Sequence, residues 1–369
     1  MDYAGSILRR ERLLKNWSQE GLCQGICTVS YLSKIEQGKA APSDEIIRLL
    51  MEKLELSWQP PDDSFIENGY LALISLDSGF EKLMDVPDPN KYIYSPLGAD
   101  FLILKSFASG KAAPLDTELE ACLSTRQLAF QRLLQRRFDE AARLFPCGYF
   151  HYYEGVHHYQ RGHLTAAVEA LQAAYTAASN EGHPRVMLMS RMYIGNCYSN
   201  IGDIPAMLSH YGIAENIARA LGDKNSLEVI RYNTASTQLE QGNFSDALTY
   251  FESIEAPDKM VLHKLALCYE KTGQQDKALK AVEKAFSLPA DSFKPAGFED
   301  ALISPVYFRL THKDYLKSPE YGELLLNCFA RCRNEMHSGY VRFHLPWVIE
   351  WHEGNRQYKK ALELLREFS

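Results

Sequence analysis

The sequence contains no apolar run as long as the roughly 18–20 residues that a transmembrane helix needs. Its first residues, MDYAGSILRRERLLKNW, carry charges where an export signal needs an apolar stretch. It also lacks an HExxH motif, a nucleophile elbow and a phosphate-binding loop. We therefore expect a cytoplasmic chain with no membrane contact, no cofactor, no metal ion and no catalytic residues.

The cysteines show no arrangement typical of metal or redox chemistry. None of the eight has the C-x-x-C spacing of a zinc site or a redox motif. Cys23 and Cys27, and likewise Cys328 and Cys332, are four residues apart, which is one helical turn. We expect free, buried thiols in a reducing cytosol rather than disulfides or metal ligands.

The composition is that of an ordinary globular protein with a negative net charge. The chain has 369 residues, of which 46% are hydrophobic and 24% charged, and its formal net charge is −7. This length suffices for two or three domains. The first 42 residues hold six basic and four acidic side chains, so a locally positive end precedes an acidic body. Such a distribution is compatible with DNA binding at the N-terminal end.

The segment SQEGLCQGICTVSYLSKIEQG, residues 18–38, has the pattern of two short helices. Ser18 is a favourable N-cap residue, and Gly25 interrupts the apolar positions. A second helix is expected from about Thr28 to Glu36, where a glycine stops it. Two short helices joined by a tight bend form a helix-turn-helix, whose second helix can enter a DNA major groove.

The flanking sequence sets the predicted domain boundaries. A helix is expected over residues 3–15, and Ser43 is expected to cap a fourth helix. The segment SWQPPDD, residues 57–63, cannot continue a helix because it contains two adjacent prolines. We predict a helix-turn-helix domain over 1–58, a linker and irregular helical region over 59–116, and a repeat domain over 117–369.

The rest of the chain repeats a helical pattern. The stretches GVHHYQRGHLTAA, GNCYSNIGDIPAM, ASTQLEQGNFSDA and ALCYEKTGQQDKA share a small first residue and a glycine seven residues later. The four turn glycines are Gly162, Gly202, Gly242 and Gly273, at intervals of 40, 40 and 31 residues. Small residues allow neighbouring helices to approach closely, so the pattern predicts stacked helix–turn–helix units.

Both parts resemble known families. The repeats resemble tetratricopeptide repeats, somewhat elongated, over about residues 117–369. The head, GSILRRERLLKNWSQ…SKIEQGKAAPS, resembles the repressor-like helix-turn-helix family often called Xre, with a turn one residue shorter than usual. We therefore expect an all-α fold: an N-terminal repressor-like helix-turn-helix domain followed by a right-handed tetratricopeptide-like α-solenoid.

The combination resembles the peptide-sensing regulators of Gram-positive bacteria, the Rgg–NprR–PlcR–PrgX class. That resemblance implies a dimeric, non-enzymatic transcriptional regulator that acts in quorum sensing. Its expected partners are double-stranded operator DNA, a short peptide that is secreted and then imported, and a second copy of the chain.

The residues predicted to read DNA bases lie at the start of the second short helix. Thr28, Val29 and Ser30 open it, and Lys34 follows Ser30 by one turn. Ser30 and Lys34 can hydrogen-bond to base edges, whereas Val29 can contact a thymine methyl group. The alternative is that these side chains form only a solvated helix face.

Other residues of the head are assigned to phosphate contacts or to architecture. Gln19, at a helix N-terminus, is predicted to contact phosphate, and Arg9 and Lys39 are further phosphate candidates. The family resemblance implies that Arg12 and Glu36 form a partly buried structural pair, which suits the fork of an arginine.

The first helix of each repeat is predicted to line the concave side. The expected peptide-binding residues are Tyr152, Asn196, Asn200, Tyr232 and Lys271. Asn196 and Asn200 are one turn apart, so their amides can face the same way and hydrogen-bond to a peptide backbone. Lys271 is assigned to the terminal carboxylate of the peptide. The alternative is that the asparagines only solvate a groove or bond to a neighbouring helix.

Two other functions stay open at this point. The chain could be a protein-interaction adaptor with little or no DNA binding. An enzyme or metal protein would use the histidine cluster around residues 151–163, where Glu154 and His157 have the E-x-x-H spacing. Residues 300–369 are the expected dimer surface, because their aromatics suit an interface. The alternative is a capped monomer that hides these rings internally. These aromatics are Tyr307, Phe308, Tyr340, Phe343, Trp347 and Trp351.

Overall fold

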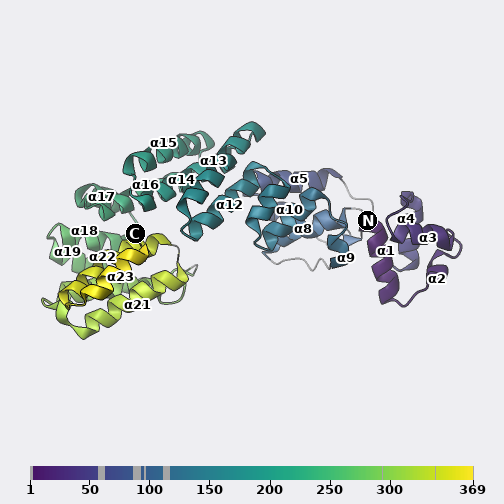
Figure 1. Cartoon of the computed structure of the whole chain (residues 1–369). Coiled ribbons are helices and arrows are strands. Elements are labelled where there is room, and N and C mark those ends of the chain that lie inside the picture. The colour runs from purple at the N-terminus through teal and green to yellow at the C-terminus, as the bar shows by residue number, and fades with distance from the viewer. Residues whose placement is uncertain are drawn as a thin grey trace. The chain divides into compact units, whose positions relative to one another are not determined.

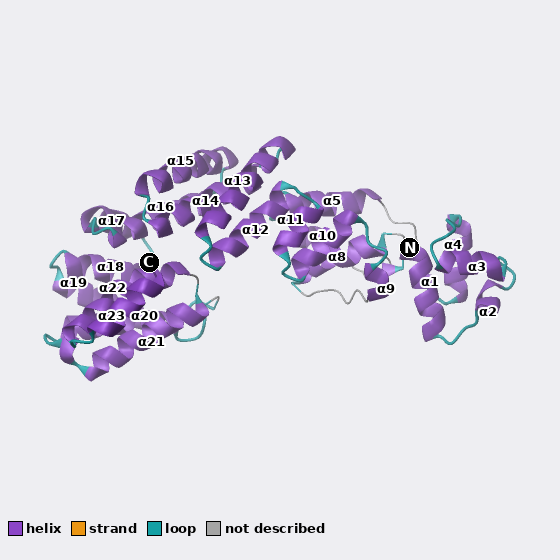
Figure 2. Ribbon diagram, viewed as in Figure 1, coloured by secondary structure: helices purple, strands orange, loops and turns teal. Residues whose placement is uncertain are grey.

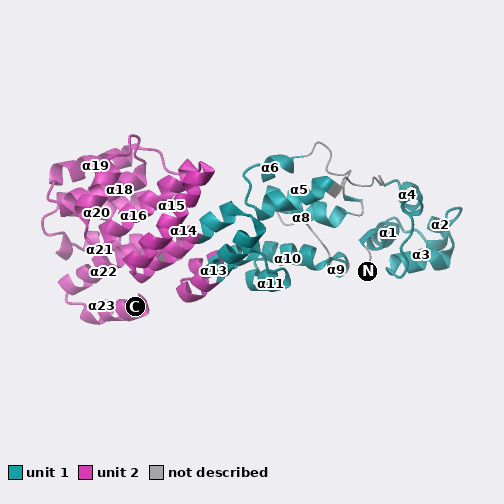
Figure 3. Ribbon diagram, turned by 90° about the horizontal axis from the view of Figure 1, so that it is seen from above, with its two compact units in different colours: residues 1–155, 170–190 teal, residues 156–169, 191–369 magenta. Residues whose placement is uncertain are grey.

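The computed structural model describes residues 3–56, 63–85, 93–94, 97–110, 117–292, 294–336 and 338–368. These ranges contain helices and no strand (Figure 2), so the predicted all-α fold class is confirmed. They divide into two compact units, one comprising residues 1–155 and 170–190 and the other residues 156–169 and 191–369 (Figure 3). Within these ranges, no helix combines the length and the apolar character that crossing a membrane requires.

The head consists of four helices at the N-terminal end of the first unit (Figure 1). They are α1 (Tyr3–Leu14), α2 (Gln19–Cys23), α3 (Val29–Glu36) and α4 (Asp44–Lys53). Hydroxyl caps set three of the starts: the side chains of Ser18, Thr28 and Ser43 accept hydrogen bonds from backbone N–H groups of α2, α3 and α4. The predicted caps at Ser18 and Ser43 are thus confirmed.

The head has its own apolar core. Leu8, Leu22, Leu32 and Ile35 are fully buried in it, together with Leu50 and Met51 of α4. Helices α1 and α3 touch backbone to backbone, since a Cβ atom at Gly5 would lie 2.1 Å from the carbonyl oxygen of Ile35. A glycine is therefore required at this crossing.

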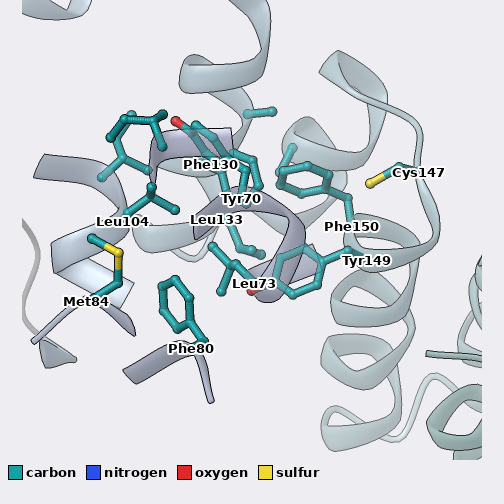
Figure 4. Close-up of a cluster of buried hydrophobic side chains, with 14 of the residues drawn as sticks. Tyr70, Leu73, Phe80, Met84, Leu104, Phe130, Leu133, Cys147, Tyr149 and Phe150 are labelled. Carbon is teal, nitrogen blue, oxygen red and sulfur yellow. The ribbon is translucent and has the colours of Figure 1, made fainter. Parts of the chain in front are cut away.

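The remainder of the first unit is a further set of helices around a second core. They are α5 (Asp63–Ile74), α6 (Phe80–Leu83), α8 (Gly98–Ser109), α9 (Thr117–Glu120), α10 (Thr125–Leu134), α11 (Phe138–Leu144) and α12 (Gly148–Gln160). Aromatic rings dominate this core, with Phe130 placed among Tyr70, Tyr149 and Phe150 (Figure 4). Residues 57–62 of the predicted linker lie outside the described ranges, and the region predicted as irregular contains α5, α6 and α8.

Long antiparallel helices build the second unit. Helices α13 (Leu164–Glu181) and α14 (Pro184–Ile201), like α12, contribute residues to both units. The following helices are α15 (Ile204–Leu221), α16 (Lys224–Glu240), α17 (Phe244–Glu252), α18 (Lys259–Lys271), α19 (Gln275–Ser287), α20 (Phe298–Thr311), α21 (Pro319–Glu335), α22 (Ser338–Gly354) and α23 (Tyr358–Phe368), with a short 3₁₀ helix at Tyr315–Lys317.

The repeat pattern in the sequence corresponds to these helix pairs. All four turn glycines have a positive φ, between 76° and 85°, a conformation that glycine adopts without strain. At Gly195 of α14 a Cβ atom would lie 2.3 Å from the ring of Tyr211 on α15, so the small residue permits the close approach that the pattern predicted. The prediction of stacked helix–turn–helix units is confirmed.

The aromatic side chains expected to form a dimer surface are mostly internal. Tyr307 is 39% exposed, but Phe308 and Phe343 are buried. Tyr340, Trp347 and Trp351 pack against the apolar core between α20, α21 and α22. Phe308 and Phe343 are therefore unavailable for an interface, and Tyr340, Trp347 and Trp351 are partly used for packing between the C-terminal helices, whereas the role of residues 300–369 as a dimer surface stays a prediction.

Candidate functional site

The recognition helix α3 exposes the side chains that the sequence assigned to base contacts. Val29 is 43% exposed, and Ser30 and Lys34 are exposed one turn apart. Thr28 is also exposed, but its hydroxyl oxygen accepts a hydrogen bond from the backbone N–H of Tyr31 and so caps the helix. The face of α3 that carries Ser30 and Lys34 is therefore available to a ligand, and the DNA role of all four residues stays a prediction.

Behind this face lies a buried charge network. The Nε and Nη2 atoms of Arg12 donate to the two carboxylate oxygens of Glu36 at 2.6 and 2.9 Å, and Nη1 donates to the carbonyl oxygen of Trp17 at 2.7 Å. Gln19 adds a hydrogen bond from Nε2 to Glu36 at 2.8 Å. Arg12 and Glu36 thus join α1 to α3 with a bidentate pair, in the arrangement that the family resemblance implied.

The phosphate candidates of the head are placed differently from one another. Arg9 is half-buried and lines a small hollow of about 260 Å³ together with Gln19. Lys39 is exposed beyond the end of α3. Because Glu36 already holds the side-chain amide of Gln19, the backbone at the start of α2 is the better candidate for a phosphate contact.

The second unit contains a polar cavity of about 190 Å³. Its walls come mainly from α14, α16, α18 and α22. The lining residues are Tyr159, Asn196, Ser199, Asn200, Tyr211, Tyr232, Asn233, Ser236, Thr237, Glu240, Met260, His263, Lys264, Gly339, Tyr340, Phe343 and His344. An adjoining cavity of about 500 Å³ shares Ser199, Asn200 and Glu240 with it and reaches α23 at Leu365. A concave surface on which aromatic rings and several polar groups converge is a candidate ligand site.

The cavity brings together three of the five residues predicted to bind a peptide. Asn196, Asn200 and Tyr232 line it. Lys271 is exposed at the last position of α18 and is not among the lining residues. Tyr152 is buried in the first unit, where its ring packs against Tyr153. The peptide-binding role of all five residues stays a prediction.

The two asparagines of α14 present complementary groups. The Oδ1 atom of Asn196 accepts from the Tyr211 hydroxyl at 2.5 Å and from Nδ2 of Asn233 at 3.2 Å. The Nδ2 atom of Asn200 donates to the Tyr159 hydroxyl at 3.3 Å and to the carbonyl oxygen of Asn196 at 3.0 Å. The described residues offer no partner for the amide N–H groups of Asn196 or for Oδ1 of Asn200. The helix thus carries one unused donor and one unused acceptor a turn apart.

Ionisable groups occupy the deep part of the cavity. Lys264 is buried, which lowers its pKa to about 8, and its ammonium lies 3.2 Å from the centre of the Phe343 ring. Burial also raises the pKa of Glu240, an effect that the charge of Lys264 opposes. Burial lowers the pKa of His263 well below its usual value. Lys264 makes no hydrogen bond or ion pair within the described part of the chain, although the charge of Glu240, which lines the same cavity, acts on it and raises its pKa.

Several lining residues were not predicted from the sequence. Tyr211 lies on α15, the second helix of a repeat. Asn233 lies on α16, one position after Tyr232, and so next to the helix face that the repeat register selects. Tyr340, Phe343 and His344 come from α22, which closes the cavity from a segment with no recognisable repeat register. At Lys264 the sequence shows only a single lysine within a helical pattern, and such a lysine does not reveal that it is buried.

The histidine cluster forms local contacts. The Nδ1 atom of His151 lies 3.2 Å from a carboxylate oxygen of Glu154. The rings of His157 and His158 are 6.1 Å apart between centroids. These contacts join neighbouring residues on one helix and do not pair Glu154 with His157 as the E-x-x-H interpretation requires. Glu154 and His158 do lie close to Asp139 of α11, with the ligand atoms of all three within 4.8 Å of one another.

Comparisons with known proteins fit this geometry. Residues 8–60 match the helix-turn-helix family, and residues 135–182 and 261–292 match tetratricopeptide repeats. The predicted combination of an Xre-type head with tetratricopeptide-like repeats is confirmed by these matches. No curated protein matches the chain.

Solved structures match the chain at low sequence identity. A Rap protein complexed with Competence and Sporulation Factor has a TM-score of 0.53 at 13% identity, over 83% of this chain and 96% of that one. The Rap conjugation gene regulator of plasmid pLS20, in complex with the Phr* peptide, has a TM-score of 0.45 at 13% identity, over 100% and 96%. PlcR of Bacillus thuringiensis, in complex with the peptide PapR7 and DNA, has a TM-score of 0.27 at 14% identity, over 75% and 99%. The first of these shows that the solenoid fold is shared.

Proposed function

We propose that this chain is a cytoplasmic, non-enzymatic transcriptional regulator that binds operator DNA through its head and a short signalling peptide through its repeats. The observation that carries the proposal is a polar cavity with unused amide groups and an unpaired buried lysine, on the same chain as a helix-turn-helix. The Rap protein of similar fold is complexed with a Competence and Sporulation Factor, which supports a ligand in the solenoid.

The DNA-binding half of the proposal rests on α3. Its exposed face carries Ser30 and Lys34, which can donate to base edges in a major groove, and Val29, which can contact a thymine methyl group. Arg9, Lys39 and the start of α2 would contact phosphates, with Thr28 holding the N-terminus of α3 in place. The network behind α3 keeps this face in a fixed orientation.

The peptide half rests on the two asparagines. An extended peptide presents a carbonyl acceptor and an N–H donor from each residue, and one asparagine amide can pair with one of each. The unused N–H group of Asn196 and the unused oxygen of Asn200 match that alternation. Recognition through backbone groups tolerates different peptide side chains, while Tyr232 can pack against an apolar one.

Lys264 is the candidate partner for an acidic group of the peptide. A buried ammonium without a carboxylate raises the free energy of the folded protein, and a ligand carboxylate would offset that cost. We therefore assign the terminal carboxylate, or an acidic side chain, to Lys264 and not to Lys271. Tyr152 is likewise left out of the peptide site.

We also propose that the chain acts as a homodimer. Operator half-sites are commonly about one helical turn apart, and two heads are needed to bind both. Helix α23 offers an exposed apolar stripe for such contact, since Tyr358 is 63% and Leu362 is 48% exposed. Because most of the aromatics of α20 and α22 pack against the core, this last helix is the better candidate within residues 300–369.

The proposal is tested with the full-length chain and two libraries. Sheared genomic DNA of the encoding organism is selected on the chain, and the enriched duplex is titrated by fluorescence anisotropy with and without synthetic peptides of five to eight residues. We expect one enriched motif and a peptide that changes its affinity for the chain. Absence of any enriched duplex at low salt would favour a protein-interaction adaptor and overturn the DNA-binding half.

A further inference from the structure

A cluster of two cysteines and a histidine lies in the core of the second unit, beside the peptide cavity. Cys328 and Cys332 are one turn apart on α21, and His344 projects from the neighbouring α22. Their sulfur and nitrogen ligand atoms all lie within 4.8 Å of one another, and Sγ of Cys332 is 3.7 Å from Nδ1 of His344. All three side chains are at least 96% buried.

We propose that Cys328, Cys332 and His344 form a three-coordinate site for one Cu(I) ion. Two thiolates and an imidazole are the soft donors that Cu(I) prefers. Zinc in structural sites takes four such ligands, and the described residues place no fourth cysteine, histidine or carboxylate in this cluster. Burial favours the monovalent ion further, because no water is needed to complete a trigonal coordination shell.

The site needs little rearrangement. Donor atoms about 2.0–2.3 Å from a metal in a trigonal arrangement lie roughly 3.5–4 Å from one another, so small side-chain rotations would bring the three together. His344 now uses Nδ1 to donate to the carbonyl oxygen of Tyr340 at 2.8 Å. That carbonyl belongs to residue i−4 of the same helix and keeps its backbone hydrogen bond when the imidazole leaves it.

Metal binding would also change the wall of the peptide cavity. The Nε2 atom of His344 is buried and has no hydrogen-bond partner among the described residues, and the residue lines the cavity. With its proton on Nδ1, the ring offers Nε2 as an acceptor; with Nδ1 on the metal, the proton moves to Nε2, which becomes a donor. This link between metal and ligand rests on the proposed function, whereas the metal site itself does not.

The metal site is tested by anaerobic titration of the reduced full-length chain with Cu(I) in competition with bathocuproine disulfonate. We expect one Cu(I) per chain, and a loss of at least 100-fold in affinity for Cys328→Ser/Cys332→Ser. The matched control is Cys23→Ser/Cys27→Ser, which removes two thiols of the same spacing in the head, and it should keep the affinity. Equal affinity in the first variant, or loss in the control, would overturn the site.

Two measurements on the unaltered chain keep the test independent of variant folding. X-ray absorption of the Cu(I) complex should show two sulfur ligands and one nitrogen ligand, and four-fold coordination or sulfur ligands alone would contradict the proposal. Nitrogen NMR of ¹⁵N-histidine-labelled chain should show the proton of one histidine moving to Nε2 on Cu(I) addition. An unchanged tautomer would remove the link to the cavity, and tighter binding of Zn(II) than of Cu(I) would overturn the choice of metal.

Discussion

The head and the cavity of the second unit both bury charged side chains, but they treat them in opposite ways. In the head, Arg12 and Glu36 satisfy each other, and Gln19 and the Trp17 carbonyl satisfy the remaining groups. In the cavity, Lys264 lies over the Phe343 ring without an ion pair in the described ranges. The network around Arg12 and Glu36 stabilises the fold of the head. Lys264 can still form an ion pair with a ligand that enters the cavity.

A comparison within α18 supports the same distinction. Lys259 and Lys264 are both buried, but Lys259 donates to Asp300 at 2.6 Å. Removing one partner of a buried pair leaves an uncompensated charge, whereas removing an unpaired charge relieves a cost. The two classes of buried charge should therefore respond to substitution with opposite signs.

The largest expected effect is on the head. Arg12→Ala leaves Glu36 buried without its cation and should lower the stability of α1 and α3 by about 3–5 kcal/mol. Hydrogen exchange of the full chain, read by mass spectrometry, measures this as faster exchange in those helices. The control Arg10→Ala breaks a partly exposed pair with Glu11 and should cost ~0–1 kcal/mol. Equal effects of the two variants would show that the network does not support the head.

The next effect concerns DNA discrimination. Ser30→Ala/Lys34→Ala should reduce the preference for the selected duplex over random duplex by ~1–3 kcal/mol per lost base contact. Anisotropy titrations at one fixed salt concentration measure both affinities. Lys280→Ala, an exposed lysine on α19, serves as the control and should change neither. Full specificity in the double variant would show that another face of the head reads the bases.

A smaller effect with a defined sign is expected at Lys264. Burial lowers its folded-state pKa from 10.5 to about 8, so the unfolded chain binds more protons between these pH values. The contribution of Lys264 to stability should therefore rise with pH from about 8 to 10.5, so the stability that Lys264→Met gains over the unaltered chain should shrink across this range, while buried thiols such as Cys197 and Cys268, whose pKa values burial raises, affect both proteins alike. At pH 7 the variant should be more stable by about 1–2 kcal/mol, because it no longer buries a charge.

Lys259→Met is the matched control for that variant, and urea denaturation of the second unit's helices across pH is the measurement for both. Lys259→Met should lower the free energy of unfolding by about 1 kcal/mol, a modest amount because Asp300 is half-exposed. If both lysine variants lost stability equally at pH 7, the distinction between paired and unpaired buried charges would fail.

The smallest expected effect is that of Gln19→Ala. Glu36 keeps both hydrogen bonds from Arg12, so the head should lose only ~1 kcal/mol for one removed hydrogen bond. Binding to selected and random duplex should stay unchanged, because the phosphate contact is assigned to the backbone at the start of α2 and not to this side chain. A change in specificity would instead assign Gln19 to base contact.

The sequence allowed the head to be predicted closely because its signals are local. Hydroxyl caps at Ser18 and Ser43 and the turn glycines of the repeats act within a few residues of the chain. The face of α3 likewise follows from helical periodicity alone. Asn196 and Asn200 could be placed on one face for the same reason, although the atoms that they leave unused could not.

The cavity needed three-dimensional packing. Helix α22 meets α14 from more than a hundred residues away in sequence, as the hydrogen bond from Arg342 to the carbonyl oxygen of Asn200 shows, and it lines the cavity together with α16 and α18 as well. No periodicity reports such a contact. Lys264 and Lys271 occupy the same helix, and only the packing of α22 decides that the first is buried in the cavity and the second exposed.

The most direct test of the peptide site is selection of synthetic five- to eight-residue peptides that tile the small open reading frames of the encoding genome. The retained peptide is titrated by calorimetry against the full chain, Asn196→Ala/Asn200→Ala, and the control Asn355→Ala. Asn355, like Asn200, donates two hydrogen bonds through its side-chain amide, in its case both to backbone carbonyls, but it lies outside the cavity. Our account predicts at least a 100-fold loss for the double variant and none for the control, and unchanged affinity in the double variant would contradict it.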